Sequence, residues 1–406
     1  MDLDVLIFGG GAAGLWLLDD LSRRGVRVLL LEAGRLGHGQ TVASQGILHG
    51  GLKYALQGFM TPSAREVREM PGVWKRCLLG QAAPDLSGTR VRAAACHLWQ
   101  TESLKSRLGM VAAKLSLHVA PVELAGPDRP PVFGCCRGPV YRLDEQVISP
   151  ATFTADLARQ HRDRILRYDF PRGLQISLAG PGVVARVALV HPQTGQPLEF
   201  CPRQLVLTAG AGNAELRRLC GLPGEVMQRR PLHMVLVRGS LPVLNGHCID
   251  GARTRVTVTS DCDAAGRVVW QVGGQLAEDG VALDETSLVH HARAELEQVL
   301  PGVDFSQAEW AAYRVDRAEH AHPQRGRPET ALALSEGKVI TGWPTKLVLA
   351  PQLAKNIAAL VPSPAGAALP PVAAPADWPR PDVALPPWDE SRPWRCLAPF
   401  RRSDAA

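Results

Sequence analysis

The sequence predicts an α/β protein in which a Rossmann-like domain accompanies a second domain built on an antiparallel sheet. Three observations support this prediction. A chain of 406 residues is too long for one simple core and fits two domains. Its first 32 residues have the pattern of a strand, a glycine-rich turn, a helix and a second strand. After Pro231, short strand patterns alternate with Gly- and Asp-containing turns, as in an antiparallel sheet.

The N-terminal pattern is that of a dinucleotide-binding unit. Residues 5–8 form an apolar run suited to a buried strand, and the G-x-G-x-x-G spacing follows at Gly9, Gly11 and Gly14. A helix of about ten residues then ends at Gly25. Residues 26–31 form a second apolar run that ends in Glu32.

Each position in this unit has a physical task. Gly9 allows a tight turn, Gly11 lets the backbone approach a pyrophosphate, and Gly14 lets the helix pack close to the strand. The free amides at the helix start, around Ala12 and Ala13, can receive the anion. Glu32, followed by Ala33, can accept hydrogen bonds from a ribose and disfavours a 2′-phosphate. The unit therefore predicts a dinucleotide, but by itself it does not separate FAD from NAD.

Composition excludes several classes of protein. An apolar content of 46% and a charged content of 21% exclude wholesale disorder. The net charge of +6 comes without any run of five basic residues, so we expect no nucleic-acid partner. The nine cysteines are odd in number and include no C-x-x-C pair, which favours reduced thiols in a cytoplasmic protein.

No segment has the character of a membrane span or a secretory signal. Asp2 and Asp4 stand where a signal would carry positive charge. The longest uncharged apolar run, residues 5–18, is short for a span and contains four glycines. We expect no transmembrane segment, and peripheral membrane contact stays open.

The segment GHGQTVASQGILHGGLKY, residues 37–54, is more specific than the glycine pattern. It resembles the loop that follows the second strand in the D-amino-acid oxidase superfamily of FAD enzymes. Its HGGLKY part is similar to FAD-dependent glycerol-3-phosphate dehydrogenases. The resemblance implies FAD as the cofactor, with Ser44, Gln45 and Gly46 beside it and with His49 and Gly50 near the isoalloxazine.

Two later turns strengthen this resemblance. An apolar strand at residues 204–208 leads into Ala-Gly-Ala-Gly-Asn, where Gly210 lies in the turn and Asn213 is predicted to cap a helix. Residues 339–341 lead into Gly-Trp-Pro-Thr-Lys-Leu, and a helix opens near residue 351. The second turn is similar to the superfamily's closing motif, which implies that Gly342, Thr345 and Lys346 face the flavin. The Trp-Pro pair at residues 343–344 departs from the more glycine-rich family pattern.

In this superfamily the two domains exchange segments, which implies six segments here. They are an FAD-binding domain at 1–89, 146–228 and 326–360, a substrate domain at 90–145 and 229–325, and a tail at 361–406.

We expect helices at 61–70, closed by Pro71, from a Ser149 cap to about residue 163, and at 285–300. We expect strands at 232–238, 254–259 and 268–273. The tail holds eleven prolines and three tryptophans. We therefore expect it to be extended, without helix or sheet pairing, over the globule or a partner.

Three residues are candidates for catalysis, each with a simpler alternative. His49 is a potential proton acceptor or flavin attachment point, or a residue that braces its loop. Arg314 belongs to a strand whose arginine often meets a substrate carboxylate in the family, and alternation with Trp310 would point it into an apolar pocket. Its alternative is an ion pair with Asp316 or Glu319. Lys346 would neutralise charge on the reduced flavin, or would be a solvated surface lysine.

We expect no metal site, because the His320 and His322 pair lacks further ligands at a suitable spacing. Adjacent Cys135 and Cys136 are expected to be loop thiols without a redox role.

The predicted function is an FAD-dependent dehydrogenase or oxidase that acts on a small-molecule substrate. Hydride would pass to flavin N5 from a C–H next to N or O of an anionic amine, a hydroxy acid or a phosphorylated alcohol. The electron acceptor could be oxygen, a quinone or an electron carrier. The alternatives are an NAD-dependent dehydrogenase, a flavin-binding assembly or interaction protein without turnover, and a quinone-linked enzyme resting on a membrane.

Overall fold

The structure is a computed structural model, and the part of the chain that it describes consists of residues 1–50, 62–101, 121–250, 253–322, 326, 328, 330–362 and 372–397. For residues 62–67 only the backbone is described. Residues 51–54 of the HGGLKY segment therefore lie outside the described residues.

The first sheet has a parallel centre. β1 (Asp2–Phe8) pairs in parallel with β2 (Val28–Glu32) on one side and with β11 (Pro197–Leu207) on the other. The remaining strands extend this sheet at its edges: β8 (Ile165–Arg167) and β18 (Val339–Trp343) are parallel neighbours, whereas β9 (Leu174–Gly180), β10 (Val183–Val190) and β17 (Leu332–Glu336) pair antiparallel. Because alternate side chains of β1 enter two separate cores, the strand is buried on both faces.

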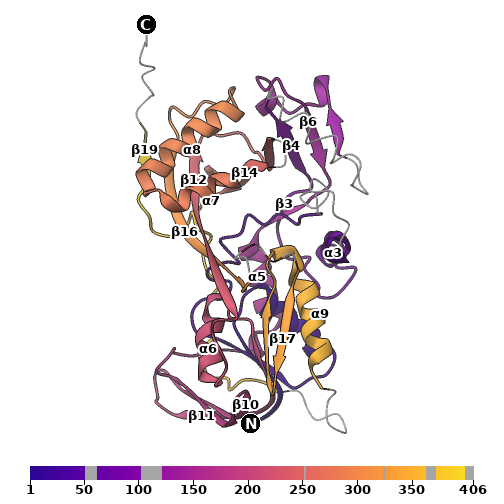
Figure 1. The fold of residues 1–406 in the computed structure, drawn as a ribbon, viewed down its shortest axis with the longest axis vertical. Helices are drawn as coiled ribbons and strands as arrows, with labels where there is room; N and C mark the ends of the chain where they lie inside the picture. Colours follow the sequence, from indigo (N-terminus) through magenta and orange to yellow (C-terminus); the bar gives the residue numbers. More distant parts are fainter. Residues whose placement is uncertain are drawn as a thin grey trace.

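Helices cover one face of this sheet. They are α1 (Ala12–Arg23), α3 (Pro62–Leu78), α5 (Pro150–Gln160) and α9 (Ala350–Leu360). The β9–β10 hairpin, the short helix α6 (Asn213–Leu219) and Trp378 of the tail contribute to the core on the other face. This arrangement confirms the Rossmann-like prediction and places the start of α1 directly after β1. In Figure 1, α5 and α9 lie together beside β17 of this sheet.

The helix predicted to close at Pro71 continues through it to Leu78, so its predicted end is wrong. Met70, Trp74 and Cys77 recur at helical spacing and are all buried in the core. Trp74 packs edge-on against Trp16 with ring centroids 4.7 Å apart. The burial of this stripe outweighs the hydrogen bond lost at the proline.

The second sheet is nine-stranded and mainly antiparallel. It contains β4 (Cys96–Gln100), β5 (Val122–Leu124), β6 (Val140–Leu143), β12 (Met227–Gly239), β13 (Gly246–Asp250), β14 (Arg253–Cys262), β15 (Val268–Gly273), β16 (Glu309–His320) and β19 (Arg395–Cys396). The helices α7 (Gln275–Asp279) and α8 (Glu285–Val299) pack on it, and a separate pair joins β3 (Val91–Ala93) to β7 (Val147–Ile148). The short 3-10 helices are η1 (Gly126–Asp128), η2 (Pro131–Phe133), η3 (Arg162–Arg164), η4 (Gly210–Gly212), η5 (Gly280–Ala282) and η6 (Leu347–Leu349).

The longest strand pairing of the second sheet extends from one half of the molecule into the other. β12 and β16 pair antiparallel from Met227 opposite His320 to Arg238 opposite Glu309. Together they run from the region of α8 toward α6, in the first-sheet half (Figure 1). The three strands and the helix expected between residues 232 and 300 are present, and β13 is an additional strand that the sequence pattern did not predict. The division into six exchanged segments stays a prediction.

The described part of the tail, residues 372–397, lies over both sheets. The Trp378 ring is buried, and its Nε1 donates to the Arg167 carbonyl at 2.7 Å. Trp388 is buried against strands of the second sheet. The expectation that the tail lies over the globule is confirmed, but the expectation of no sheet pairing is wrong. β19 pairs with β16, and Val383 forms a bridge with Leu36. In the bridge, the Leu36 N–H donates to the Asp382 carbonyl and the Ala384 N–H donates to the Leu36 carbonyl, so the tail supplies a donor at a position where proline would have none.

None of the helices in the described ranges is long and apolar enough to span a membrane.

Candidate active site

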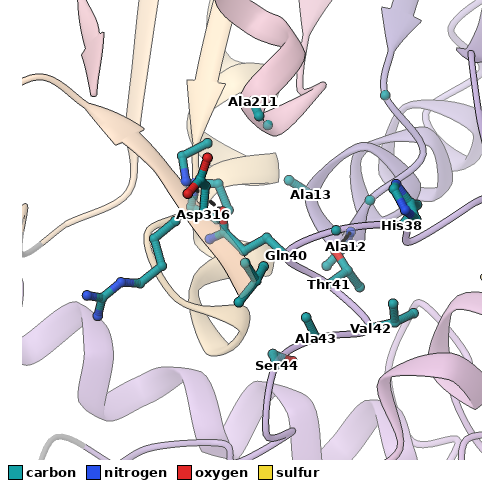
Figure 2. A pocket seen from close by; sticks show the side chains of 18 of the residues that line it. Ala12, Ala13, His38, Gln40, Thr41, Val42, Ala43, Ser44, Ala211 and Asp316 are labelled. Atoms are coloured by element: carbon teal, nitrogen blue, oxygen red, sulfur yellow. Dashed lines mark hydrogen bonds between the residues drawn. The ribbon is translucent and has the colours of Figure 1, made fainter. Parts of the chain in front are cut away.

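A cavity of about 710 Å³ is lined by residues from both sheets. Figure 2 shows the loop from His38 to Ser44 passing the start of α1 at Ala12 and Ala13, with Ala211 and Asp316 on other sides. Of the residues predicted from the sequence to bind the cofactor or substrate, those lining the cavity are Gly9, Gly11, Ala12, Ala13, Glu32, Ala33, Ser44, Gln45, Gly46, His49, Gly210, Arg314, Gly342, Thr345 and Lys346. Gly14 is not among the lining residues, since it lies behind the turn.

The glycine-rich turn depends on missing side chains. Gly9 has a φ of +104°, in the region that favours glycine. A Cβ on Gly14 would overlap the Gly9 carbonyl oxygen and lie 2.7 Å from Thr208 Oγ1. Close packing of α1 on β1 and β11 therefore requires glycine at residue 14, as predicted.

The start of α1 opens on the cavity. The Ala12 N–H donates to Thr41 Oγ1 at 3.1 Å, so the loop after β2 is tied to the helix start (Figure 2). No acidic residue lies in the first turn of α1, and the described residues give its Gly11 N-cap no side-chain hydrogen bond. The positive end of the helix dipole thus faces a space into which an anion can fit.

Glu32 lies at the end of β2, as expected for a ribose-binding carboxylate. Its Oε2 accepts from the Gly10 N–H at 2.7 Å, and its Oε1 accepts from the Gly34 N–H at 2.8 Å. These two bonds fix the carboxylate at the turn. Each oxygen has a second acceptor position, so a ribose hydroxyl can still donate to it.

Gln45 connects the loop after β2 to the second sheet. Its Nε2 donates to the carbonyls of Thr257 at 3.0 Å and Gln271 at 2.8 Å. The next residue, Gly46, has a φ of +73°, and a Cβ there would overlap the Ile148 carbonyl. The loop is therefore held at a fixed position between the sheets.

Asn213 links the two later turns instead of capping α6. Its Oδ1 accepts from the Ala209 N–H at 2.8 Å, and its Nδ2 donates to the Gly342 carbonyl at 3.2 Å. The predicted cap is wrong, because α6 already includes Asn213 and its N-cap is Gly212. Both turns line the same cavity, and the prediction that they bind FAD stays a prediction. Lys346 follows in the closing turn and lines the cavity, with η6 and then α9 after it.

Arg314 does not turn into an apolar pocket. Trp310 is fully buried, but Arg314 is exposed, and its guanidinium donates to the carbonyls of Val281 at 3.1 Å and Leu283 at 2.9 Å. The ion pair considered as its alternative is also absent from the described contacts of Arg314. Strand alternation predicted that the Arg314 side chain would turn inward, which is wrong, because η5 and the residue after it supply carbonyl acceptors at the rim of the cavity. Arg314 nevertheless lines the cavity at this rim.

His49 lies at the cavity wall beside a buried carboxylate that the sequence analysis did not single out. Its Nδ1 is 3.5 Å from Glu145 Oε2, and His247 Nε2 is 3.9 Å from the same oxygen. Burial would raise the pKa of Glu145, but the nearby ring and charge of His49, the charge of His247 and the hydrogen bond from the Gly50 N–H together lower it below its usual value. Glu145 and His247 are separated from His49 by about a hundred and two hundred residues. The bridge between Ile47 and Val147 brings His49 to Glu145, and the pairing of β13 with β4 and of β4 with β6 brings His247 to the same place.

The comparisons with known proteins agree with this geometry. The family model for FAD dependent oxidoreductases, named DAO, matches residues 4–359. A probable FAD-dependent oxidoreductase of Pseudomonas aeruginosa is 39% identical over 402 residues, which cover 96% of this chain and 98% of that protein.

This chain belongs to the DAO family of FAD-dependent oxidoreductases. It is an oxidoreductase whose cofactor is FAD, which replaces the NAD-dependent and non-catalytic alternatives.

Solved structures of the DAO family show the same fold. The crystal structure of an FAD dependent oxidoreductase from Pseudomonas aeruginosa has a TM-score of 0.79 at 36% identity, covering 96% of this chain and 98% of that one. L-α-glycerophosphate oxidase from Mycoplasma pneumoniae, with FAD bound, has a TM-score of 0.63 at 13% identity, covering 97% and 100%. A local match of 43% identity over 72 residues to anaerobic glycerol-3-phosphate dehydrogenase subunit A1 of Haloferax volcanii covers 18% of this chain and 12% of that protein.

The cavity fits the cofactor of the DAO family. Ser44 Oγ and Thr345 Oγ1 are buried at its wall, and neither hydroxyl has a hydrogen-bond partner among the described residues. Such groups are costly unless a ligand satisfies them. Together with the glycine turn and the start of α1, they provide a cradle and donors for FAD.

The sequence analysis also missed residues at the junction of the two sheets. Gln271 Nε2 donates to Tyr313 Oη at 2.5 Å and to the Ala43 carbonyl at 2.8 Å, and burial raises the pKa of Tyr313 above its usual value. Tyr313 lines the cavity, as do Pro387 and Glu390 of the tail. A pattern of strands does not say which tail residues reach a cavity, so no sequence signal was available for the last two.

Proposed function

We propose that this DAO-family enzyme oxidises a C–H bond next to oxygen or nitrogen in a small anionic substrate. The substrate would be an amine, a hydroxy acid or a phosphorylated alcohol. The single observation that carries this proposal is that one cavity joins the dinucleotide-binding elements to His49 and to the basic side chains of Arg314, Arg317 and Lys346.

The charged side chains that line the cavity favour the binding of an anionic substrate. The two partners of Arg314 are neutral carbonyl oxygens, so its positive charge is not cancelled by them. By contrast, the acidic lining residues Asp316 and Glu390 pair with arginines, at 3.7 Å and 2.9 Å. Glycine oxidase from Geobacillus kaustophilus, which has the same fold, is named for a substrate that carries a carboxylate; its structure has a TM-score of 0.59 and 18% identity over 89% of this chain and 94% of that one.

The proposed roles follow from position. Bound FAD supplies a hydride acceptor. Arg314 orients the anionic group of the substrate at the rim, and His49 accepts the proton that the hydroxyl or ammonium group must release. Lys346, on the closing turn, contributes positive charge near the reacting end of the cavity. The HGG segment and the local match to glycerol-3-phosphate dehydrogenase favour the alcohol among the three substrate classes.

An anaerobic donor panel tests the proposal. The FAD-loaded protein is mixed with amino acids, N-methyl amino acids, 2-hydroxy acids and glycerol phosphate, and bleaching of the visible flavin band is followed. We expect one of these classes to bleach the flavin and uncharged analogues to fail. Bleaching by uncharged analogues alone, or by none of the panel, would contradict the proposal.

The same experiment addresses the electron acceptor. Admission of air to the reduced protein separates an oxidase, which recovers its colour at once, from a dehydrogenase. Addition of a soluble quinone to the air-stable reduced form then tests the quinone-linked alternative. Co-sedimentation with anionic lipid vesicles is the corresponding test of peripheral membrane contact.

A further inference from the structure

Glu145 is a buried carboxylate beside the cavity. It lies between β6 and β7 and is 5% exposed. Its Oε1 accepts from the Gly50 N–H at 2.6 Å. Its Oε2 has no hydrogen bond within the described part of the chain, yet it faces two imidazoles, His49 Nδ1 at 3.5 Å and His247 Nε2 at 3.9 Å.

The more buried imidazole is held in place from the opposite side. His247 Nδ1 lies 2.9 Å from Thr257 Oγ1 on the neighbouring strand β14, which leaves Nε2 toward Glu145. The rings of His49 and His247 are 5.5 Å apart and inclined by 33°. His49 has 40% of its side chain exposed and His247 only 9%, so one ring faces the cavity and the other faces the core.

Charge balance requires a proton on this pair of rings. A buried carboxylate is stable as an anion only beside a positive charge. Among the described residues, the titratable groups that interact with Glu145 are His49 from the loop after residue 47, His247 from β13 and Cys96 from β4. Burial raises the pKa of the Cys96 thiol well above its usual value, so Cys96 stays neutral. The compensating charge therefore resides on an imidazole.

We propose that Glu145, His49 and His247 form one proton-sharing unit, in which Glu145 and His247 are positioning residues for His49. The unit deepens the proposed function and rests on it for the role of His49. Before reaction, the two rings share one proton, and His49 at the cavity wall can accept a second when the shared proton is on His247. On oxidation of the substrate, its O–H or N–H proton moves to His49, and Glu145 stabilises the resulting second positive charge. His49 then releases this proton to solvent, to which its ring is exposed.

The first test requires no substrate. Histidine ring signals of the FAD-loaded protein are followed by NMR against pH and are assigned with H49N and H247N. We expect the two rings to respond to one another, so that loss of either ring changes the titration of the other. In E145Q the pair should take up its first proton at a pH lower by about one unit or more, which is about tenfold in proton affinity. E215Q removes an exposed carboxylate of α6 and should leave these titrations unchanged.

The second test uses the donor found in the anaerobic panel. In stopped-flow reduction, E145Q should lower the limiting rate of flavin reduction by roughly a hundredfold and move its pH profile, with donor affinity changed by less than about threefold. E145D should restore part of the rate because it keeps the charge. H247N provides a second variant if E145Q does not fold, and it should move the pH profile in the same direction.

The outcomes separate the two proposals. Independent histidine titrations that E145Q leaves unchanged would overturn the proton-sharing unit. Stoichiometric Zn²⁺ in the FAD-loaded protein that is lost in E145Q would also overturn it, because three such ligands can hold a metal and an ion would then replace the proton. Coupled titrations in a protein whose flavin no donor reduces would support the unit and count against the proposed function.

Discussion

Thr345 has a backbone φ of +58° at the turn that closes the cavity. A β-branched residue in this region is strained, typically by about 1–3 kcal/mol. Its buried Oγ1 also has no hydrogen-bond partner among the described residues. Backbone strain and an unpaired buried hydroxyl thus occur together at one residue of the cavity wall, and a hydrogen bond from the hydroxyl to bound FAD would offset both.

Replacement of Thr345 by glycine separates these two costs. We expect T345G to raise the unfolding free energy of the FAD-free protein by about 1 kcal/mol, since glycine adopts a positive φ without strain. FAD affinity should fall about tenfold through loss of the hydroxyl. Denaturant unfolding and fluorescence titration with FAD measure the two effects. T345S, which keeps the hydroxyl, should bind FAD as the wild type does. Unchanged FAD affinity in T345G would show that the hydroxyl does not contact the cofactor.

Arg314 allows a test of substrate charge at the same scale. We expect R314Q to raise KM about tenfold and to leave kcat within about twofold, because the guanidinium binds an anion equally in the ground and transition states. The rise in KM with added salt should be weaker in R314Q, since a charge has been removed. Steady-state kinetics at two salt concentrations measure both effects. R186Q, in which an exposed arginine of β10 that does not line the cavity is replaced, is the control. An equal salt dependence in R314Q and wild type would remove Arg314 from the site.

At the scale of elements, α1 is joined to α5 by a buried carboxylate. Asp19 Oδ1 lies 3.1 Å from His161 Nε2, and Asp19 Oδ2 accepts from Arg23 Nε at 2.7 Å. Burial would raise the pKa of Asp19, but the hydrogen bonds of His161 and Arg23 lower it below its ordinary value of 3.8. This contact holds the helix whose start forms the cradle.

The lowered pKa gives the direction of a pH effect. A carboxyl whose pKa is depressed on folding stabilises the protein above its unfolded value, and this stabilisation is lost as pH falls through the folded value. We expect D19N to lower the unfolding free energy by about 1–2 kcal/mol at neutral pH. The difference from wild type should shrink below about pH 4. Denaturant unfolding at several pH values measures it, and D20N, which removes a partly buried carboxylate paired with the half-exposed Arg24, should cost less. A difference that is constant with pH would contradict the assignment.

The sequence predicted elements best where local pattern and burial agree. The unit β1–α1–β2 follows from apolar runs, spaced glycines and a terminal glutamate, all of which act over short distances. The end of α3 was wrong because tertiary packing of Trp74 kept the helix intact beyond Pro71. The cap at Asn213 was wrong because a second turn, 129 residues away, competes for its side chain.

At the scale of the whole molecule, sequence reasoning found the FAD half of the site more completely than the substrate half. The residues predicted to bind FAD lie in three short motifs, each recognisable by itself, and most of them line the cavity. Glu145 follows β6, His247 lies in β13, and Gln271 reaches Tyr313 only through pairing of β12 with both β15 and β16. Such contacts depend on strand order and register, which local patterns do not specify.

The tail contributes to stability on the same scale. Trp378 is 5% exposed and packs in the core on the outer face of the first sheet. We expect W378A to lower the unfolding free energy by roughly 3 kcal/mol, through loss of burial and the cavity left behind. L385A, in which an exposed residue of the same segment changes, should cost less than about 0.5 kcal/mol. Denaturant unfolding compares them, and limited proteolysis should release the tail faster from W378A. Equal stability of the two variants would mean that the tail only rests on the sheet.

Pro387 and Glu390 line the cavity but are among the last residues of the chain to be synthesised. Chains emerge from the ribosome N-terminus first, and the early part can fold before the rest is made. The nascent protein can therefore form the nucleotide cradle while one wall of its cavity has yet to be translated, which gives FAD an open route inward. Premature termination near residue 380 would yield a chain able to capture the coenzyme but with an incomplete chamber for the molecule it oxidises.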